Sequence, residues 1–108
     1  TTSSRWQGMC ARLAGMRSCA PIREHGHSAG AVRVQHVSCN QARPIVAFYS
    51  RLIETGRPED APGVNRVPVR GGEWRCFGRI RWVEVNEVLF VGCRNGRGRG
   101  RVRFVMGS

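Results

Sequence analysis

The sequence predicts an α+β fold, in which one helix at about residues 44–55 is followed by a three-stranded antiparallel sheet at about residues 73–106. Two observations predict this order: apolar residues recur at helical spacing after Pro44, and the period later changes to two. A third observation, the placement of charge, separates an extended basic N-terminal arm over residues 1–43 from a small α+β module over residues 44–108.

Positive charge is concentrated at the two ends of the 108-residue chain. The net charge of +11 comes from 18 basic residues, all of them arginine, against 7 acidic residues. Residues 1–50 contain six arginines and one acid, residues 51–90 seven arginines and six acids, and residues 91–108 five arginines and no acid. Basic ends around a balanced middle are typical of a folded module with extensions that bind a polyanion. A GC-rich genome would also favour arginine, so composition alone leaves both explanations open.

The arm is predicted to carry one short helix over residues 5–18, whereas residues 20–43 show no sustained period and are expected to be extended. The apolar stripe of the helix consists of Trp6, Met9, Cys10, Leu13 and Met16. The chain starts at Thr1, and the arm has the arginine-rich, acid-poor composition of an organellar targeting peptide. We therefore expect a retained arm of an organellar protein.

The predicted helix of the module begins at Pro44, a favourable first-turn residue, and ends at Gly56 and Pro58. Its apolar side chains follow at positions i, i+3, i+4, i+7 and i+8, and they are Ile45, Phe48, Tyr49, Leu52 and Ile53.

Alternation of residue types predicts the three strands. In the first strand, one face is formed by Trp74, Cys76, Gly78, Ile80 and Trp82, and the other, mostly basic face by Arg75, Phe77, Arg79 and Arg81. A turn near residues 83–87 leads to a second strand at residues 88–91. The loop at Asn95 and Gly96 then returns the chain into a third strand at residues 101–106.

Two short motifs give the module a family resemblance. The segments VNRVPVRGG (Val64–Gly72) and VLFVGCRNGRGRGRV (Val88–Val102) resemble, in this order, the N-terminal, double-stranded-RNA-binding-like domain of organellar small-subunit ribosomal protein five over residues 64–104. In that family a basic strand ends at a Gly-Gly turn, matched here by Gly71 and Gly72, and a hydrophobic strand ends at a glycine-rich hairpin. The resemblance implies binding of ribosomal RNA through these two turns.

Physical chemistry predicts the same contact, because glycines let a loop approach a phosphate backbone and arginines neutralise phosphates. The alternative is a solvated basic tail around a tight hairpin. The predicted RNA-binding residues are Arg66, Arg70, Gly71, Gly72, Arg75, Arg79, Arg94, Asn95, Arg97, Arg99, Arg101 and Arg103.

Other chemistry has little support in the sequence. Five cysteines without regular spacing indicate a reducing compartment rather than a disulfide framework, and Cys76 and Cys93 are expected to pack as small apolar residues. Zinc-ligand types occur together at Cys19, His25, His27, His36 and Cys39, but no CxxC pair accompanies them. We expect no metal or cofactor, and Trp74 and Trp82 are interpreted as core residues rather than base-stacking residues.

The leading hypothesis is that the chain is a structural protein of an organellar ribosome, specifically the mitochondrial ribosome in the matrix. Its expected partners are ribosomal RNA and neighbouring ribosomal proteins. No catalytic motif or small-molecule site is recognised, so an enzyme is not expected. No apolar run reaches the length of a membrane span. The alternative hypothesis is an accessory subunit of a large organellar membrane complex, such as a respiratory complex, without contact to nucleic acid.

Overall fold

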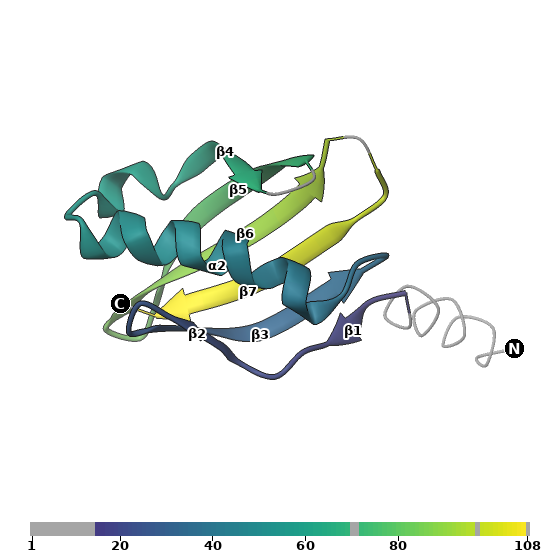
Figure 1. The fold of residues 1–108 in the computed structure, drawn as a ribbon. Helices are drawn as coiled ribbons and strands as arrows, with labels where there is room; N and C mark the ends of the chain where they lie inside the picture. The colour runs from purple at the N-terminus through teal and green to yellow at the C-terminus, as the bar shows by residue number, and fades with distance from the viewer. Residues whose placement is uncertain (1–14, 70–71, 97, 108) are drawn as a thin grey trace, which may run out of the picture.

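The computed structural model describes residues 15–69, 72–96 and 98–107, which form an antiparallel sheet of seven strands, one α-helix and one short 3-10 helix (Figure 1). The strand order is β1-β3-β7-β6-β5-β4, and β2 pairs with β3 outside this path. The elements are β1 (Arg17–Ser18), β2 (Ile22–Glu24), β3 (His27–Gln35), α2 (Cys39–Glu54), η1 (Pro58–Asp60), β4 (Gly63–Val69), β5 (Gly72–Val83), β6 (Asn86–Asn95) and β7 (Arg101–Gly107).

The predicted fold class, one helix followed by a three-stranded sheet, is therefore wrong. Three strands precede the helix within the segment expected to be an extended arm, and β3 pairs with the last strand, β7. A two-residue turn of His25 and Gly26, with φ of 53° and 79°, joins β2 to β3 in place of the usual Asn-Gly. A register shift between Gly30 and Arg33, where Ala31 has a φ of 49°, interrupts the alternation of β3. This bulge explains why no period was visible in the sequence.

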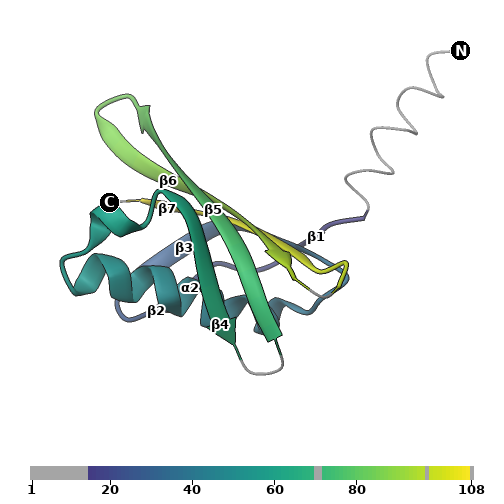
Figure 2. The same ribbon diagram turned by 90° about the horizontal axis from the view of Figure 1, so that it is seen from above.

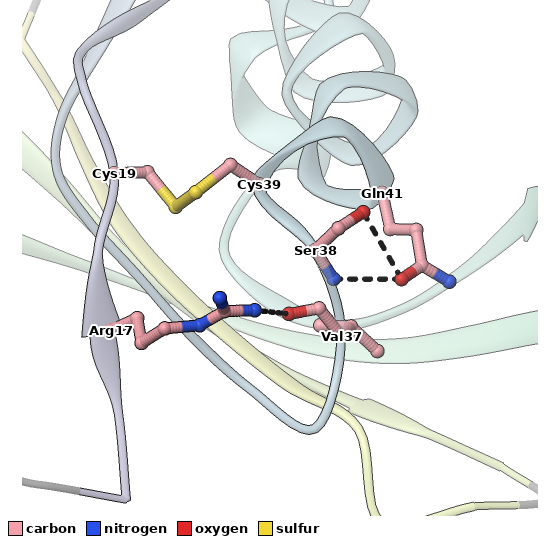
Figure 3. The surroundings of a disulfide bond; sticks show 6 residues. All are labelled: Arg17, Cys19, Val37, Ser38, Cys39 and Gln41. Carbon is pink, nitrogen blue, oxygen red and sulfur yellow. Dashed lines mark hydrogen bonds between the residues drawn. A yellow bond between two sulfur atoms is a disulfide. The ribbon is translucent and has the colours of Figure 1, made fainter.

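The helix begins five residues before the predicted start. Ser38 is its N-cap, and the Ser38 backbone N–H donates to Gln41 Oε1 at 2.8 Å while the Ser38 hydroxyl donates to the same oxygen at 3.3 Å (Figure 3). This cap outweighs the preference of Pro44 for the first turn, so Pro44 lies inside the helix and removes one i to i−4 hydrogen bond. The other predicted helix, over residues 5–18, lies mostly outside the described residues, and Arg17 and Ser18 form β1.

The strands predicted over residues 73–106 are β5, β6 and β7, each longer than expected, with β4 added at the edge. A turn of Glu84 and Val85 joins β5 to β6, and Glu84 has a φ of 59°. Figure 2 shows that the turn end of this hairpin projects away from the helix. Trp74 is buried, as predicted, but Trp82 near the end of the hairpin is 68% exposed, so its interpretation as a core residue is wrong.

The core lies between α2 and one face of the sheet, here called the covered face. Tyr49 of the helix meets Phe104 of β7 edge to face, with ring centroids 5.8 Å apart. At Gly78 of β5, an added Cβ would overlap the Ala61 carbonyl oxygen, so the close approach of the two backbones requires glycine there. The covered face of the three central strands consists of Trp74, Cys76, Gly78, Leu89, Val91, Cys93, Val102, Phe104 and Met106.

Two disulfides link four of the cysteines. Cys19 bonds to Cys39 and joins the segment between β1 and β2 to the first residue of the helix, with the Cα atoms 5.8 Å apart (Figure 3). Cys76 and Cys93 lie directly opposite each other on β5 and β6, with the Cα atoms 4.0 Å apart. The expectation of unpaired cysteines is wrong here, because the partners are set by strand register and helix position rather than by spacing. Cys10 lies outside the described residues.

Candidate nucleic-acid interface

The sheet face opposite α2, here called the open face, has no helix over it in the described part of the chain (Figure 2). Side chains on this face alternate with the buried ones along each strand. Nine exposed arginines belong to it, and they are Arg23, Arg33, Arg66, Arg75, Arg79, Arg81, Arg94, Arg101 and Arg103.

Four of these arginines form a single row across the sheet, here called the arginine row. Strand register places Arg66 opposite Arg75, Arg75 opposite Arg94, and Arg94 opposite Arg101. Neighbouring strands lie about 4.8 Å apart, so the row spans about 14 Å. Like charges directly opposite each other destabilise a sheet. The fold therefore keeps an arrangement that is unfavourable by itself and that a bound polyanion would stabilise.

Little of this positive charge is neutralised within the protein. Among the described strand residues, Glu73 is the one acid that alternates onto the open face, and its Oε1 lies 3.6 Å from Arg66 Nε. Across the described residues, the other eight arginines of the open face have no ion pair and no side-chain hydrogen bond. Their guanidinium groups are available to an external anion.

Aromatic side chains accompany the arginines on the same face. Phe77 of β5 is 56% exposed, and Phe90 of β6 is 39% exposed. Register places Phe77 opposite Gly92, Gly92 opposite Arg103, and Arg103 opposite Arg33 in a second row beside the arginine row. Exposed aromatic rings among positive charges are the combination with which proteins bind nucleic-acid bases and phosphates together.

The structure brings together half of the sequence-predicted site residues on the open face. These are Arg66, Arg75, Arg79, Arg94, Arg101 and Arg103. Arg99 is exposed in the loop before β7, outside the two rows. Gly72 is the first residue of β5 and Asn95 the last residue of β6, and the Asn95 backbone N–H donates to the Gly100 carbonyl at 3.0 Å. Arg70, Gly71 and Arg97 lie outside the described residues.

Five arginines and aromatic residues of the open face are missing from the predicted site: Arg23, Arg33, Arg81, Phe77 and Phe90. The period of two had already placed Phe77 and Arg81 on the basic face, so that signal was sufficient to include them. Phe90 follows from the register of β6 with β5, which no local pattern specifies. Arg33 follows only from the pairing of β3 with β7.

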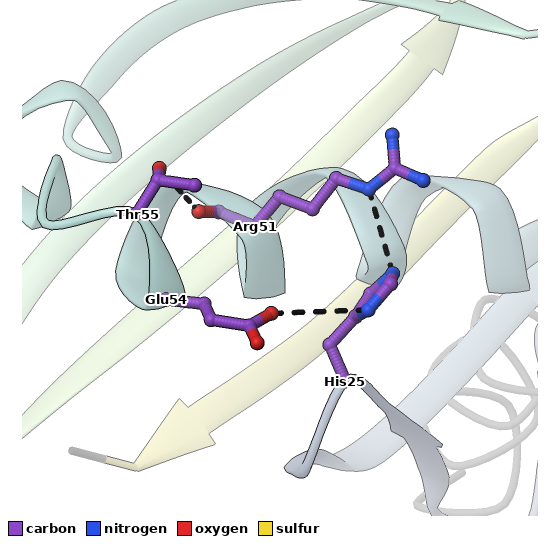
Figure 4. A network of polar contacts seen from close by, with 4 residues as sticks. All are labelled: His25, Arg51, Glu54 and Thr55. Atoms are coloured by element: carbon purple, nitrogen blue, oxygen red, sulfur yellow. Dashed lines mark hydrogen bonds and ion pairs between the residues drawn. The ribbon is translucent and has the colours of Figure 1, made fainter.

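A separate polar cluster lies at the end of the helix, away from the open face. In Figure 4, Arg51 Nε donates to His25 Nε2 at 3.4 Å, and His25 Nδ1 lies 3.8 Å from Glu54 Oε2. This exposed network joins the β2–β3 turn to the end of the helix. Cys19 and Cys39 are disulfide-bonded, and in the described ranges no three metal-ligating side chains come together.

Comparisons with known proteins identify no relative: no family model, no curated protein and no solved structure matches the chain. The resemblance to small-subunit ribosomal protein five therefore stays a prediction. Within residues 15–69, 72–96 and 98–107, no helix is long and apolar enough to cross a membrane.

Proposed function

We propose that this protein binds RNA on the open face of its sheet. The observation that carries the proposal is the arginine row, in which four guanidinium side chains on adjacent strands stand directly opposite one another. Phosphates spaced along a nucleic acid would neutralise Arg75, Arg94 and Arg101, which the protein leaves without an ion pair. The exposed rings of Phe77 and Phe90 favour a polyanion that also carries bases.

A merely soluble surface would be built differently. Surfaces that serve solubility intersperse charges of both signs, whereas the open face carries nine arginines and, in the described strands, one carboxylate. The acids Glu24, Glu54, Glu59 and Asp60 instead lie on the helix side or in the loop after the helix. This segregation favours binding of a polyanion over the alternative of a solvated basic surface.

The setting that we propose is a mitochondrial ribosome in the matrix, with ribosomal RNA and neighbouring ribosomal proteins as partners. Its support comes from the sequence alone, namely the composition of the first residues and the family resemblance. The two disulfides weigh against a matrix location, because disulfides are typical of oxidising compartments. We expect the protein to co-sediment with ribosomal subunits and to be released from them by ribonuclease. This experiment tests the ribosomal location and is separate from the binding titration with purified RNA.

The test of RNA binding is a filter-binding titration with a structured ribosomal RNA fragment at several salt concentrations. We expect affinity to fall steeply with salt. Replacing Arg75, Arg94 and Arg101 with Gln should weaken binding and flatten the plot of log affinity against log salt by about 0.7–0.9 per lost phosphate contact. Salt-independent or absent binding by the wild type would overturn the proposal.

A matched control variant loses the same number of positive charges on the helix side of the molecule. Replacing Arg43, Arg51 and Arg57 with Gln alters the helix and the residues just after it and leaves the open face intact. If this control weakens binding as much as the open-face variant does, net charge rather than the arginine row determines affinity.

A second candidate function is an accessory subunit of an organellar membrane complex that contacts protein rather than nucleic acid. The observation that favours it is the apolar end of the β5–β6 hairpin, where Trp82 is 68% exposed and Val85 is 84% exposed. Exposed apolar clusters mark protein contacts. Under this alternative the protein should remain with detergent-solubilised membrane complexes after ribonuclease treatment.

A further inference from the structure

The centre of the open face has a gap at Gly92. A Cβ built on Gly92 would meet no atom within 4 Å, and its φ lies outside the left-handed region that favours glycine. Neither the backbone conformation nor close packing therefore requires glycine at this position. Glycine inside a strand lowers stability, and one of its uses there is to admit a ligand close to the backbone.

The walls of this gap suit a flat ring. Phe77 on β5 and Arg103 on β7 stand directly opposite Gly92 on its two sides, so about 10 Å separates their strands. Two surface depressions meet at this point, and both are lined by Phe77, Gly92 and Arg103. A planar group in the gap would stack on an aromatic ring on one side and on a guanidinium on the other.

The guanidinium groups beside the gap could bind the phosphates of a nucleic-acid backbone. Arg94 follows Gly92 by two residues on β6 and belongs to the arginine row, and Arg75 and Arg101 are its neighbours in that row. A ring held over Gly92 would thus have guanidinium groups along one side, about two residues or 7 Å away along the strand. A nucleotide has this combination of a flat base and a negative charge at a short distance.

We propose that the gap over Gly92 binds one unstacked base of a single-stranded RNA segment, which stacks on Phe77 while the arginine row holds its phosphates. This inference rests on the proposed function and names its substrate class. The bases of an A-form duplex are stacked on each other and offer no free ring face to Phe77, so a paired segment cannot fill the gap.

The first test fills the gap. Replacing Gly92 with Val should preserve the fold, because no atom obstructs the new side chain and valine favours strands. We expect about fivefold or greater loss of affinity for an oligouridylate, with an unchanged salt slope because the phosphate contacts remain. A matched control is Gly107→Val, at an open position elsewhere on the sheet, which should leave affinity unchanged.

The second test keeps the wild-type protein and changes the ligand. An oligonucleotide with the same phosphates but abasic positions should bind about five- to hundredfold more weakly than the intact oligouridylate, and so should a duplex of equal length at the same salt. The corresponding DNA oligonucleotide distinguishes a requirement for ribose from a requirement for a base. Phe77→Leu should reduce the difference between intact and abasic ligands.

The outcomes separate this inference from the function on which it rests. If the wild type binds RNA with a steep salt dependence but does not distinguish intact from abasic ligands, the base site is wrong and RNA binding stands. Equal affinity of Gly92→Val and wild type for the oligouridylate would also overturn it. If the wild type binds no RNA at any salt concentration, the proposed function itself fails.

Discussion

The covered face and the open face are built from the same strands, yet their side chains have opposite character. On β7, Val102, Phe104 and Met106 are at most 1% exposed, whereas Arg101 and Arg103, which alternate with them, are exposed. Burial of apolar area on one face stabilises the fold, and the unpaired arginines on the other face oppose it. Substitutions one residue apart should therefore have opposite effects on stability, and those on the open face should also weaken binding.

The largest effect on stability is expected when a phenylalanine of the covered face is replaced, and a phenylalanine of the open face provides the comparison. Phe104→Ala on the covered face should lower the free energy of unfolding by about 3–5 kcal/mol, because it opens a cavity beside Tyr49. Phe77→Ala on the open face should change it by less than about 0.5 kcal/mol, because Phe77 is 56% exposed. Chemical denaturation measures both values. Equal losses would show that the open face is packed against something within the protein.

The next effect concerns the disulfide beneath the open face. Cys76 and Cys93 join β5 to β6, the strands that carry Arg75 and Arg94. Replacing both cysteines with Ala should lower the free energy of unfolding by about 3 kcal/mol, the value for a loop of similar length. Denaturation with and without a reducing agent measures the free energy of unfolding. The reducing agent should lower this free energy less in the variant than in the wild type.

Alkaline pH should weaken the covered face without altering the charge of the open face. Burial raises the pKa of Tyr49 to about 12, and a hydrogen bond from Asn65 partly offsets this. Because the folded state keeps the phenol protonated, stability is fully present below about pH 10 and is lost as the pH rises toward 12, by roughly 2–3 kcal/mol. Arginines stay charged in this range.

The chain contains one tyrosine, so tyrosinate absorbance during alkaline titration reports Tyr49 directly. Tyr49→Phe should remove most of the loss of stability between pH 10 and 12. If the absorbance titrates near pH 10 in the folded protein, Tyr49 is not buried as described.

The smallest effect should have the opposite sign. The Gln variant of Arg75, Arg94 and Arg101 should be more stable than the wild type by roughly 0.5–1 kcal/mol at low salt, because like charges no longer face each other across the strands. The gain should disappear in high salt, where exposed charges are screened. Thermal unfolding at two salt concentrations measures it. A loss of stability would mean that the arginines have partners within the protein.

Local patterns in the sequence were sufficient to predict that β5, β6 and β7 are consecutive antiparallel strands. Alternation located the inward residues of β7 and the basic face of β5 correctly. The same patterns failed where structure depends on distant partners. The alternation of β3 is interrupted at Ala31, so this strand is recognised mainly through its pairing with β7. The start of the helix depends on the Ser38 cap rather than on Pro44.

The candidate site was only half predictable for a related reason. Arginines with period two could be recognised on β5, and those on β6 and β7 followed from the glycine-rich hairpin. Their alignment into one row depends on the registers of three strand pairs, and a shift by a single residue would turn the side chains of a strand to the other face. The disulfide of Cys76 and Cys93 depends on the same register.

The two edges of the sheet also bear on how the protein behaves at high concentration. β1 contains two residues, and β4 carries Arg66 and Pro68, which lacks a backbone N–H to offer another strand. Short edges, charge and proline are the features that prevent strands of different molecules from pairing. We therefore expect the purified protein to resist fibril formation and to stay available for binding at high concentration.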